Sequence, residues 1–191
     1  MPHVFDPGEM HKLDAPERRD EMPPEHTLLK AGLRPRDIFL DIGCGTGYFA
    51  IPATRVVGPR GKILACDVSQ MMLAELRSRA AAAGIFNIDT AQCGHAGEKL
   101  PEAEATMALL ADVLHEVEHK GPLLAALRKS LVPGARLAII EWRKEATPHG
   151  PPPAQRLDAA EITKLLDNSH YEEPSVLELG KEHLLYLSKK P

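Results

Sequence analysis

A glycine-rich segment, DIGCGTG at residues 41–47, is the feature that most restricts how this chain can fold. An apolar run at residues 38–42 leads into it, and an apolar stretch extending to Val57 follows it. This order predicts a buried strand, a tight turn and a helix. Glycines at positions 43, 45 and 47 let the backbone approach a ligand closely, and the free amides at the helix start favour a negative or carboxylate-bearing group. The segment therefore predicts a ligand-binding turn.

The glycine spacing excludes the commonest nucleotide-binding turns. A dinucleotide site requires the pattern GxGxxG, but the residue three beyond Gly45 is Tyr48, and the third glycine comes one position early, at Gly47. The chain also has no GxxxxGK[ST] run, the phosphate-binding loop of nucleoside triphosphatases. Nicotinamide, flavin and nucleoside triphosphate ligands are therefore disfavoured.

Two carboxylates indicate a different ligand. Asp41, at the entry to the turn, would repel a pyrophosphate but attract an ammonium group. Asp67 ends the next apolar run, 20 residues beyond Gly47, where a carboxylate can accept hydrogen bonds from ribose hydroxyls. An ammonium group and a ribose together suggest S-adenosylmethionine.

The rest of the chain predicts a doubly wound α/β sheet. Strands are expected at residues 62–66, 88–93, 105–111 and 136–141, with helices between them, and a turn at residues 132–134 is expected to precede the last of these strands. Repeated strand–helix units imply parallel pairing. Two final strands, 175–179 and 184–188, have a connection short enough for a hairpin and should be antiparallel.

Proline positions divide the chain into an arm and one domain. Of the 17 prolines, five lie within residues 1–24, a polar and irregular stretch, and four within residues 147–153. We read residues 1–23 as an N-terminal arm, an expected lid over the ligand or else a free charged tail, and residues 24–191 as a single domain. The loop at 147–153 is expected to shape the opposite rim of the site.

Composition narrows the classes of protein further. The net charge of −4 argues against a dedicated nucleic-acid binder, and no apolar segment is long enough to span a membrane. Cys44, Cys66 and Cys93 match neither a disulfide framework nor a metal site, and we expect them to be small buried hydrophobic residues. We therefore expect a cytoplasmic protein whose site holds no metal.

The sequence resembles the class I S-adenosylmethionine-dependent methyltransferases, and in particular their small ubiquinone/menaquinone-biosynthesis-like branch. The resemblance is carried by DIGCGTG, Asp67, the LHEV segment at 114–117 and the LVPG turn at 131–134. It covers residues 24–145 well and the remainder by topology. It implies a Rossmann-like, seven-stranded sheet in the order 3-2-1-4-5-7-6, with strand 7 antiparallel and S-adenosylmethionine across the carboxyl ends of strands 1 and 2.

The resemblance also implies cofactor-binding roles for individual residues. Asp41 would hold the amino group, the glycine loop would border the methionine moiety, Asp67 would bind the ribose diol, and Val68 and Met71 would pack against the adenine. The family usually has an acidic residue on the adenine edge where this chain has Gly94-His95-Ala96, which leaves His95 and Ala96 to read that edge. The full expected set is Asp41, Gly43, Cys44, Gly45, Gly47, Asp67, Val68, Met71, His95, Ala96 and Ala111.

The methyl acceptor should lie where the fourth and fifth strands end. His115 is the expected residue facing the acceptor, because its ordinary pKa of about 6.5 suits proton removal near neutrality. Glu141 and Arg143 are further catalytic candidates, and could instead pair with each other or bind a polar acceptor group.

These observations predict methyl transfer to a small molecule. A module that binds S-adenosylmethionine without transferring a methyl group remains an alternative, as does a protein or RNA methyltransferase. The acidic net charge and the sequence Leu110-Ala111-Asp112-Val113, where an NPPY-like tetrapeptide would stand, disfavour the latter. The sequence leaves the oligomeric state and the atom methylated open.

Overall fold

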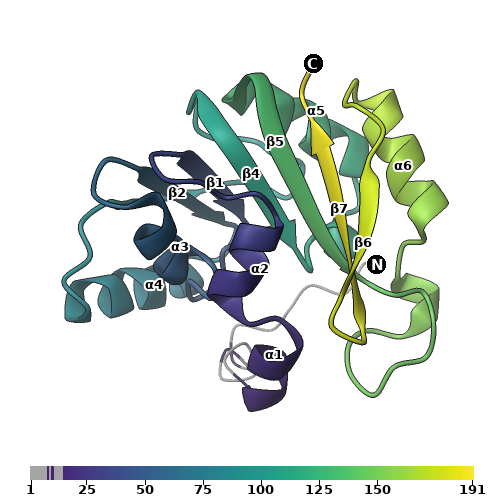
Figure 1. Ribbon diagram of the computed structural model, residues 1–191, viewed down its shortest axis with the longest axis horizontal. Coiled ribbons are helices and arrows are strands. Elements are labelled where there is room, and N and C mark those ends of the chain that lie inside the picture. The colour runs from purple at the N-terminus through teal and green to yellow at the C-terminus, as the bar shows by residue number, and fades with distance from the viewer. Residues whose placement is uncertain (1–7, 9, 11–14) are drawn as a thin grey trace.

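The chain is organised around a seven-stranded sheet in the order β3-β2-β1-β4-β5-β7-β6 (Figure 1). The computed structural model describes residues 8, 10 and 15–191. The strands are β1 Ile38–Ile42, β2 Lys62–Asp67, β3 Ile88–Gln92, β4 Ala105–Ala111, β5 Leu131–Trp142, β6 Ser175–Leu179 and β7 His183–Lys189. The helices are α1 Pro16–Glu21, α2 Pro24–Lys30, α3 Ala50–Val57, α4 Gln70–Ala82, α5 Lys120–Ser130 and α6 Ala159–Asn168, with short 3₁₀ turns at Leu114–Glu116 and Pro153–Gln155.

The pairing confirms the predicted topology. β1 pairs in parallel with β2 and β4, β2 with β3, and β4 with β5, whereas β7 is antiparallel to both β5 and β6. The carboxyl ends of β1, β2, β4 and β5 therefore meet at one edge of the sheet. Because β7 runs the opposite way, its first residue, His183, lies at this same edge, opposite Trp142 of β5.

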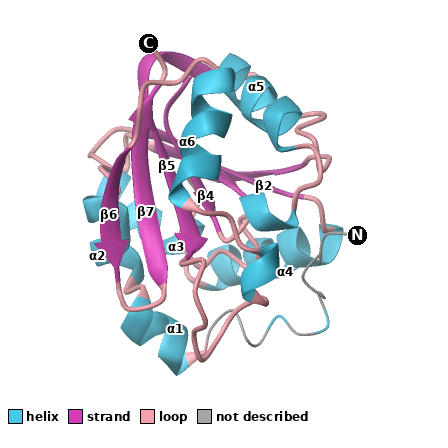
Figure 2. Ribbon diagram, turned by 90° about the vertical axis from the view of Figure 1, so that its right-hand side faces the viewer, coloured by secondary structure: helices cyan, strands magenta, loops and turns pink. Residues whose placement is uncertain are grey.

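Helices cover both faces of the sheet. One core contains Leu28 of α2, Ala53 of α3 and Leu76 of α4, all buried against alternate strand residues. The other contains Leu127 of α5 and Leu166 of α6. Figure 2 shows α5 and α6 together on one side of the sheet and α2 on the other. No helix among the described residues has the length and apolarity that a membrane crossing needs.

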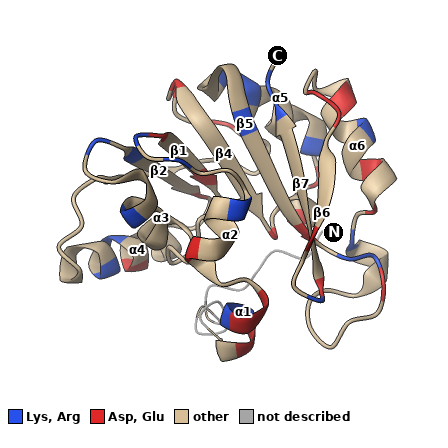
Figure 3. Cartoon of the chain, viewed as in Figure 1, with Lys and Arg blue, Asp and Glu red and all other residues tan. Residues whose placement is uncertain are grey.

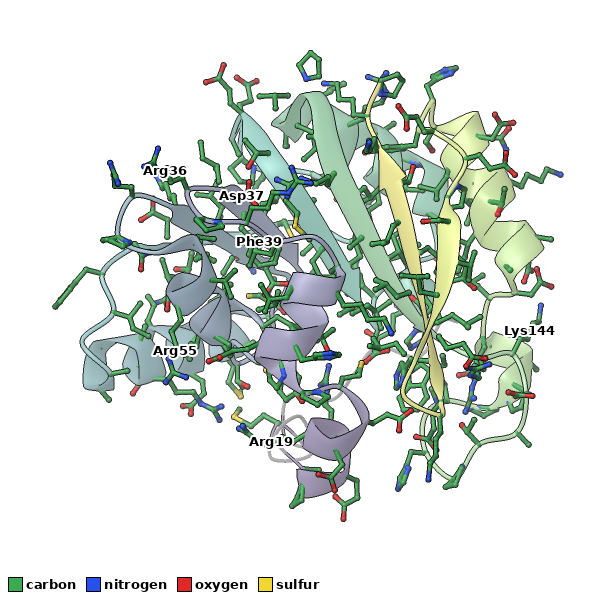
Figure 4. The ribbon with its side chains drawn as sticks, in the orientation of Figure 1. Arg19, Arg36, Asp37, Phe39, Arg55 and Lys144 are labelled. Atoms are coloured by element: carbon green, nitrogen blue, oxygen red, sulfur yellow. The ribbon has the colours of Figure 1, made fainter. Side chains whose placement is uncertain are left out.

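Local signals in the sequence explain where several helices begin. Ser69 accepts a hydrogen bond from the Met72 amide, 3.3 Å, as expected of the cap of α4. Asp158 and Glu161 form a reciprocal capping box at the start of α6. Lys144, which precedes this helix in the chain, adds ion pairs to both carboxylates (Figure 4).

Two sequence expectations are wrong in detail. Residues 132–134 do not form a turn ahead of the fifth strand: α5 runs directly into β5, and the residues between Leu131 and Arg136 bulge out of the pairing with β4. Gly134 adopts φ +75° there, and its amide donates to the carbonyl of Lys190. In the arm, residues 16–21 form the helix α1 rather than irregular chain.

An ion pair secures the edge of the sheet opposite the carboxyl ends. Asp37, just before β1, accepts hydrogen bonds from Arg136 Nη2 at 2.5 Å and from Thr106 Oγ1 at 2.8 Å. Arg136 also donates to the carbonyl of Gly32. Asp37 is labelled in Figure 4 at the edge far from α1. These contacts tie β1, β4 and β5 together away from the cavity.

Candidate active site

A cavity of about 770 Å³ opens at the carboxyl ends of the strands, and residues of α1 line part of it. Several parts of the fold line it: the α1 segment, the loops after β1, β2 and β3, the segment after β4, the loop after β5 and the start of β7. Ligands of open α/β sheets bind at this edge. The cavity is therefore the candidate site.

Glycines 43 and 47 have backbone conformations and close neighbours that leave no room for a side chain. Gly43 adopts φ +69°, and a Cβ there would lie 2.4 Å from Val113 Cγ2. Gly47 adopts φ +94°, and a Cβ there would lie 2.4 Å from a methyl carbon of Leu76. The amides of Gly43 and Cys44 both donate to the carbonyl of Cys66, at 2.8 and 3.0 Å, which ties the loop to the end of β2. Gly43 and Gly45 line the cavity.

Asp67 is held against this loop by backbone amides. Its carboxylate accepts hydrogen bonds from the amide of Gly45 at 2.9 Å and the amide of Ser69 at 2.8 Å. Burial raises its pKa, although these amides and the charge of His95 lower it in part. Each carboxylate oxygen keeps a further lone pair, so Asp67 can accept a ribose hydroxyl from the cavity that it lines.

Asp41 is a buried carboxylate that lacks a full set of partners. It is 2% exposed, and its Oδ2 atom has no hydrogen-bond partner among the described residues. Burial and the neighbouring Asp67 raise its pKa to about 7, against the lowering effects of Arg18 and the Ala50 amide. Such a group gains a compensating charge from a bound ammonium.

Two residues expected at the adenine end, Met71 and Ala96, are not among the described residues that line the cavity. Val68, Gly94 and His95 line the cavity, and so does Met72, which is 4% exposed. Met71, the predicted residue, is 57% exposed. The Ala96 amide, expected to read the adenine edge, donates to Glu98 Oε2 at 3.0 Å.

The three cysteines are buried and free, as expected. Burial raises the pKa of Cys93, the cysteine that lines the cavity, to about 11, so its thiol is protonated near neutrality. Burial also raises the pKa of Cys44 and Cys66. A thiolate role is therefore disfavoured for all three.

His115 and Glu141 form a close pair on the acceptor side. His115 Nδ1 lies 2.8 Å from Glu141 Oε2, and the His115 amide donates to Glu141 Oε1 at 3.2 Å. Burial lowers the pKa of His115, but the hydrogen bond and charge of Glu141, with Asp112 and Glu116, raise it above its ordinary value overall. Glu141 is 1% exposed, so it orients His115 from beneath while His115 lines the cavity.

Arg143 does not pair with Glu141. Its Nη2 atom lies 3.2 Å from Glu178 Oε1 on β6, whereas Glu141 is engaged by His115. Arg143 is also not among the described residues that line the cavity. The alternative of a Glu141–Arg143 ion pair is therefore wrong, because β5 places Glu141 inward and Arg143 beside the neighbouring hairpin.

Three further charged or titratable residues line the cavity, and of these only His183 is not expected there from the sequence. Asp112 follows β4 with φ +58°, Arg18 of α1 places Nη2 3.3 Å from Asp112 Oδ2, and His183 Nε2 lies 3.2 Å from Asp112 Oδ1. The predicted hairpin contains the signal for His183, because a last strand antiparallel to its neighbours must begin at the edge where the parallel strands end. Nothing in the sequence pairs Arg18 with Asp112.

The loop after β5 forms one rim, as its prolines suggested. Gly150, Pro151 and Pro152 line the cavity. Arg156 lies beneath the loop, 3% exposed, and donates to the carbonyls of residues 143, 145, 149 and 151. Its guanidinium also lies 5.3 Å from the ring centroid of Trp142, so one buried side chain organises the whole rim.

A family model described as a methyltransferase domain matches residues 39–134, about half of the chain. The chain belongs to this methyltransferase family. The match includes the glycine loop, Asp67 and the segment after β4, and it ends at the bulge in β5.

Relatives support the family assignment. A protein from Marinomonas sp., named ubiquinone/menaquinone biosynthesis C-methyltransferase, is 31% identical over 62% of this chain and 48% of its own length. A Ralstonia pickettii protein of the same name is 32% identical, with the same coverage of both chains. The chain thus spans about half the length of the curated relatives it matches.

A solved structure matches nearly the whole methyltransferase chain. A SAM-dependent methyltransferase from Aquifex aeolicus superposes with a TM-score of 0.93 and 29% identity, covering 98% of this chain and 100% of its own. A Mesorhizobium loti methyltransferase shares the fold at 19% identity and a TM-score of 0.67. Proteins of this family use S-adenosylmethionine as the methyl donor.

The residues of this chain fit that cofactor. The unpartnered carboxylate oxygen of Asp41 suits an ammonium group. The glycine loop lets the backbone approach a ligand closely, and Val113 and Leu76 leave no room there for larger residues. Asp67 has the acceptor capacity that ribose hydroxyls require, and Val68 and Met72 offer apolar surface for a base. The chain therefore has a complementary group for each part of the cofactor: Asp67, Val68 and Met72 line the cavity, and Asp41 directly precedes the cavity-lining residues 42 and 43.

Proposed function

We propose that this chain transfers a methyl group from S-adenosylmethionine to a small-molecule acceptor. The observation that carries the proposal is a cavity lined by Gly43, Asp67 and His115. The buried, unpartnered Asp41 carboxylate lies close enough to Asp67 for that charge to raise its pKa, and Glu141 holds His115 from behind. A purely structural glycine turn requires neither the carboxylates nor the histidine. Family membership supports the same reading.

The chain's own residues bind the cofactor and position the acceptor. Asp41 would hold the ammonium group and Asp67 the ribose, while Val68 and Met72 would contact the adenine. Bound there, S-adenosylmethionine supplies a methyl group already activated on a sulfonium. Alignment of the acceptor with that methyl carbon is then the main task of the protein, and such positioning can supply about 7–11 kcal/mol of a barrier.

His115 is the proposed base. Donation from Nδ1–H to Glu141 leaves the Nε2 lone pair for a proton on the acceptor. As the acceptor's nucleophilic atom is methylated, His115 Nε2 would accept the proton that this atom loses, and S-adenosylhomocysteine would be the second product. Glu141 keeps the ring oriented and stabilises the imidazolium that forms.

We infer that residues 1–23 act as a lid. Within the described part of this arm, Arg18 and Met22 line the cavity, and Tyr48 Oη after the glycine loop donates to their carbonyls at 3.1 and 2.8 Å. The Arg18 guanidinium also lies 4.5 Å from the Tyr48 ring centroid. Figure 3 shows the mixed charges of α1, and Figure 4 shows Arg19 on it. The expected contributions of residues 1–7, 9 and 11–14 lie outside the described residues.

Calorimetry and a turnover screen test the proposal. The protein should bind S-adenosylmethionine and S-adenosylhomocysteine in preference to NAD, and Asp67→Asn should weaken both. Asp89→Asn is a matched control, because Asp89 is an exposed residue of β3 paired with Lys62. Absence of binding, or equal preference for NAD, would contradict the proposed cofactor.

Turnover separates the alternatives. Release of S-adenosylhomocysteine with a member of a small-molecule acceptor panel supports methyl transfer. Binding of the cofactor with no release in any such panel would instead favour a binding module. Release only with protein or RNA acceptors would contradict the small-molecule assignment.

A further inference from the structure

Three charged or titratable side chains from distant parts of the chain meet on one wall of the cavity. Arg18 comes from α1, Asp112 from the end of β4 and His183 from the start of β7, and all three line the cavity. Arg18 Nη2 lies 3.3 Å from Asp112 Oδ2, and His183 Nε2 lies 3.2 Å from Asp112 Oδ1. The proposed cofactor contacts and the His115–Glu141 pair use none of them.

Several polar atoms of this group are buried without a hydrogen-bond partner. Both ring nitrogens of His183, Asp112 Oδ1 and Arg18 Nε have none among the described residues, so the 3.2 Å contact between His183 and Asp112 is an ion-pair contact without hydrogen-bond geometry. His183 is 2% exposed and its ring is 4.0 Å, centroid to centroid, from Trp142. Buried polar atoms in proteins are almost always hydrogen-bonded, so these three cavity-lining residues keep hydrogen-bonding capacity that the described residues do not use.

Asp112 is held in an unusual backbone conformation. Its φ is +58°, and its amide donates to the Ile140 carbonyl at 2.9 Å, which links it to β5. Residues held in the left-handed region cluster at ligand sites, where the surrounding structure maintains them. The conformation therefore agrees with a binding role for its carboxylate.

The Asp112 carboxylate of this group faces the Arg18 cation. Burial raises the pKa of Asp112, but the charge and contact of His183, with the charges of Arg18 and His115, lower it overall below its ordinary value. Asp112 is therefore ionised near neutrality and faces the Arg18 cation. A carboxylate or phosphate on the ligand would meet Asp112, and an ammonium group would meet Arg18. An uncharged hydroxyl can donate to Asp112 and accept from Arg18 or His183.

We propose that Asp112 and His183, with Arg18, form the subsite that selects the methyl acceptor, and that it takes an uncharged, hydroxyl-bearing molecule whose apolar body lies against Trp142. This inference rests on the proposed function, because it assigns the acceptor end of the same cavity. Trp142, Val113 and Val117 supply the apolar surface beside the polar group.

The single tryptophan makes the subsite observable without a known acceptor. The indole signal of Trp142 is followed by NMR in the protein saturated with S-adenosylhomocysteine, during titrations with benzyl alcohol, benzylamine and benzoate. These probes share a ring and differ in the charge of one group. Benzyl alcohol should reach half-saturation at a concentration at least tenfold lower than either charged probe.

Two variants assign the effect to the subsite. Asp112→Asn removes the charge, and His183→Phe removes both ring nitrogens but keeps a ring against Trp142. Each should raise the half-saturating concentration of benzyl alcohol at least fivefold, while binding of S-adenosylhomocysteine to His183→Phe stays within twofold of the unmodified protein. Asp89→Asn, away from the cavity, should change neither.

The outcomes separate this inference from the proposed function. Equal responses to the three probes, no response to benzyl alcohol, or unchanged alcohol binding in His183→Phe would overturn the subsite while leaving cofactor binding intact. Failure of the unmodified protein to bind S-adenosylhomocysteine would contradict the proposed function itself. His183→Phe keeps the Arg18–Asp112 pair, so this variant tests the subsite even where Asp112→Asn disturbs α1.

Discussion

Replacement of Asp41 by asparagine should make the protein more stable and its cofactor binding weaker. Burial and Asp67 raise the pKa of Asp41 from 3.8 to about 7, so the folded state holds the proton more tightly than the unfolded chain does. The stabilisation from that proton is complete below pH 3.8 and is lost as the pH rises through 7. At 1.36 kcal/mol per pKa unit, the ionised carboxylate costs about 4 kcal/mol above pH 7.

Asparagine has nearly the same shape and cannot ionise. Asp41→Asn should therefore raise the free energy of unfolding by about 2–4 kcal/mol at pH 8, with no gain at pH 4. For a chain of this size the gain corresponds to about 4–16 °C in Tm, measured by calorimetric melting at both pH values. Asp89→Asn should shift Tm little at either pH, because Asp89 is exposed.

Cofactor affinity should move in the opposite direction. The unmodified protein should lose affinity for S-adenosylmethionine about tenfold per pH unit below 7, as Asp41 takes up its proton. Asp41→Asn should bind about 10- to 100-fold more weakly at pH 7.5 and lose this pH dependence. Binding of 5′-methylthioadenosine, which lacks the ammonium group, should be unaffected.

The combination is diagnostic of a carboxylate kept unpaired for a cationic ligand. A variant that is less stable than the unmodified protein at pH 8 would refute the assignment of a destabilising buried charge. A variant that is more stable but binds S-adenosylmethionine with unchanged affinity would refute the ammonium site.

Three further predictions concern the base, the lid and the sheet edge. His115→Gln should reduce turnover about 10²- to 10⁴-fold with cofactor affinity unchanged. In the unmodified protein turnover should rise with pH around a midpoint above 6.5, because Glu141 raises the pKa of His115, and this rise should disappear in the variant. A retained pH profile would contradict the base role. Tyr48→Phe should weaken S-adenosylmethionine binding about 3- to 10-fold, because it releases α1. Tyr171→Phe removes a buried hydrogen bond to a carbonyl elsewhere and should leave the affinity unchanged. Equal effects of the two variants in calorimetry would contradict the lid. Asp37→Ala should cost about 3–5 kcal/mol in denaturant unfolding by leaving Arg136 unpaired, and a loss below about 1 kcal/mol would show that the ion pair contributes little.

Local chemistry explains why the cofactor half could be predicted from the sequence. The glycine loop, Asp41 and Asp67 are set by their positions at the ends of two apolar strands, so strand, turn and carboxylate can be read within one stretch of chain. The sheet order followed from the resemblance and the strand–helix alternation. The resemblance indicates Met71, but the structure buries Met72 instead, because sequence spacing places both on one helix and does not say which face of α4 meets the sheet.

The acceptor half depends on contacts between residues far apart in the chain. His115 and Glu141 are 26 positions apart, and Arg18 and Asp112 are 94 apart, so only the docking of β4 beside β5 and of α1 over the strand ends brings each pair together. The bulge at residues 132–134 likewise arises from the pairing of β5 with β4 and β7.

The sequence by itself determined the sheet, the ligand-binding turn and the two carboxylates, because apolar periodicity and glycine spacing act over neighbouring residues. Only the tertiary structure decided which charged side chains face each other across the cavity. The pKa and partners of a buried charge depend on groups that chain folding brings within a few ångströms, and no local pattern records that proximity.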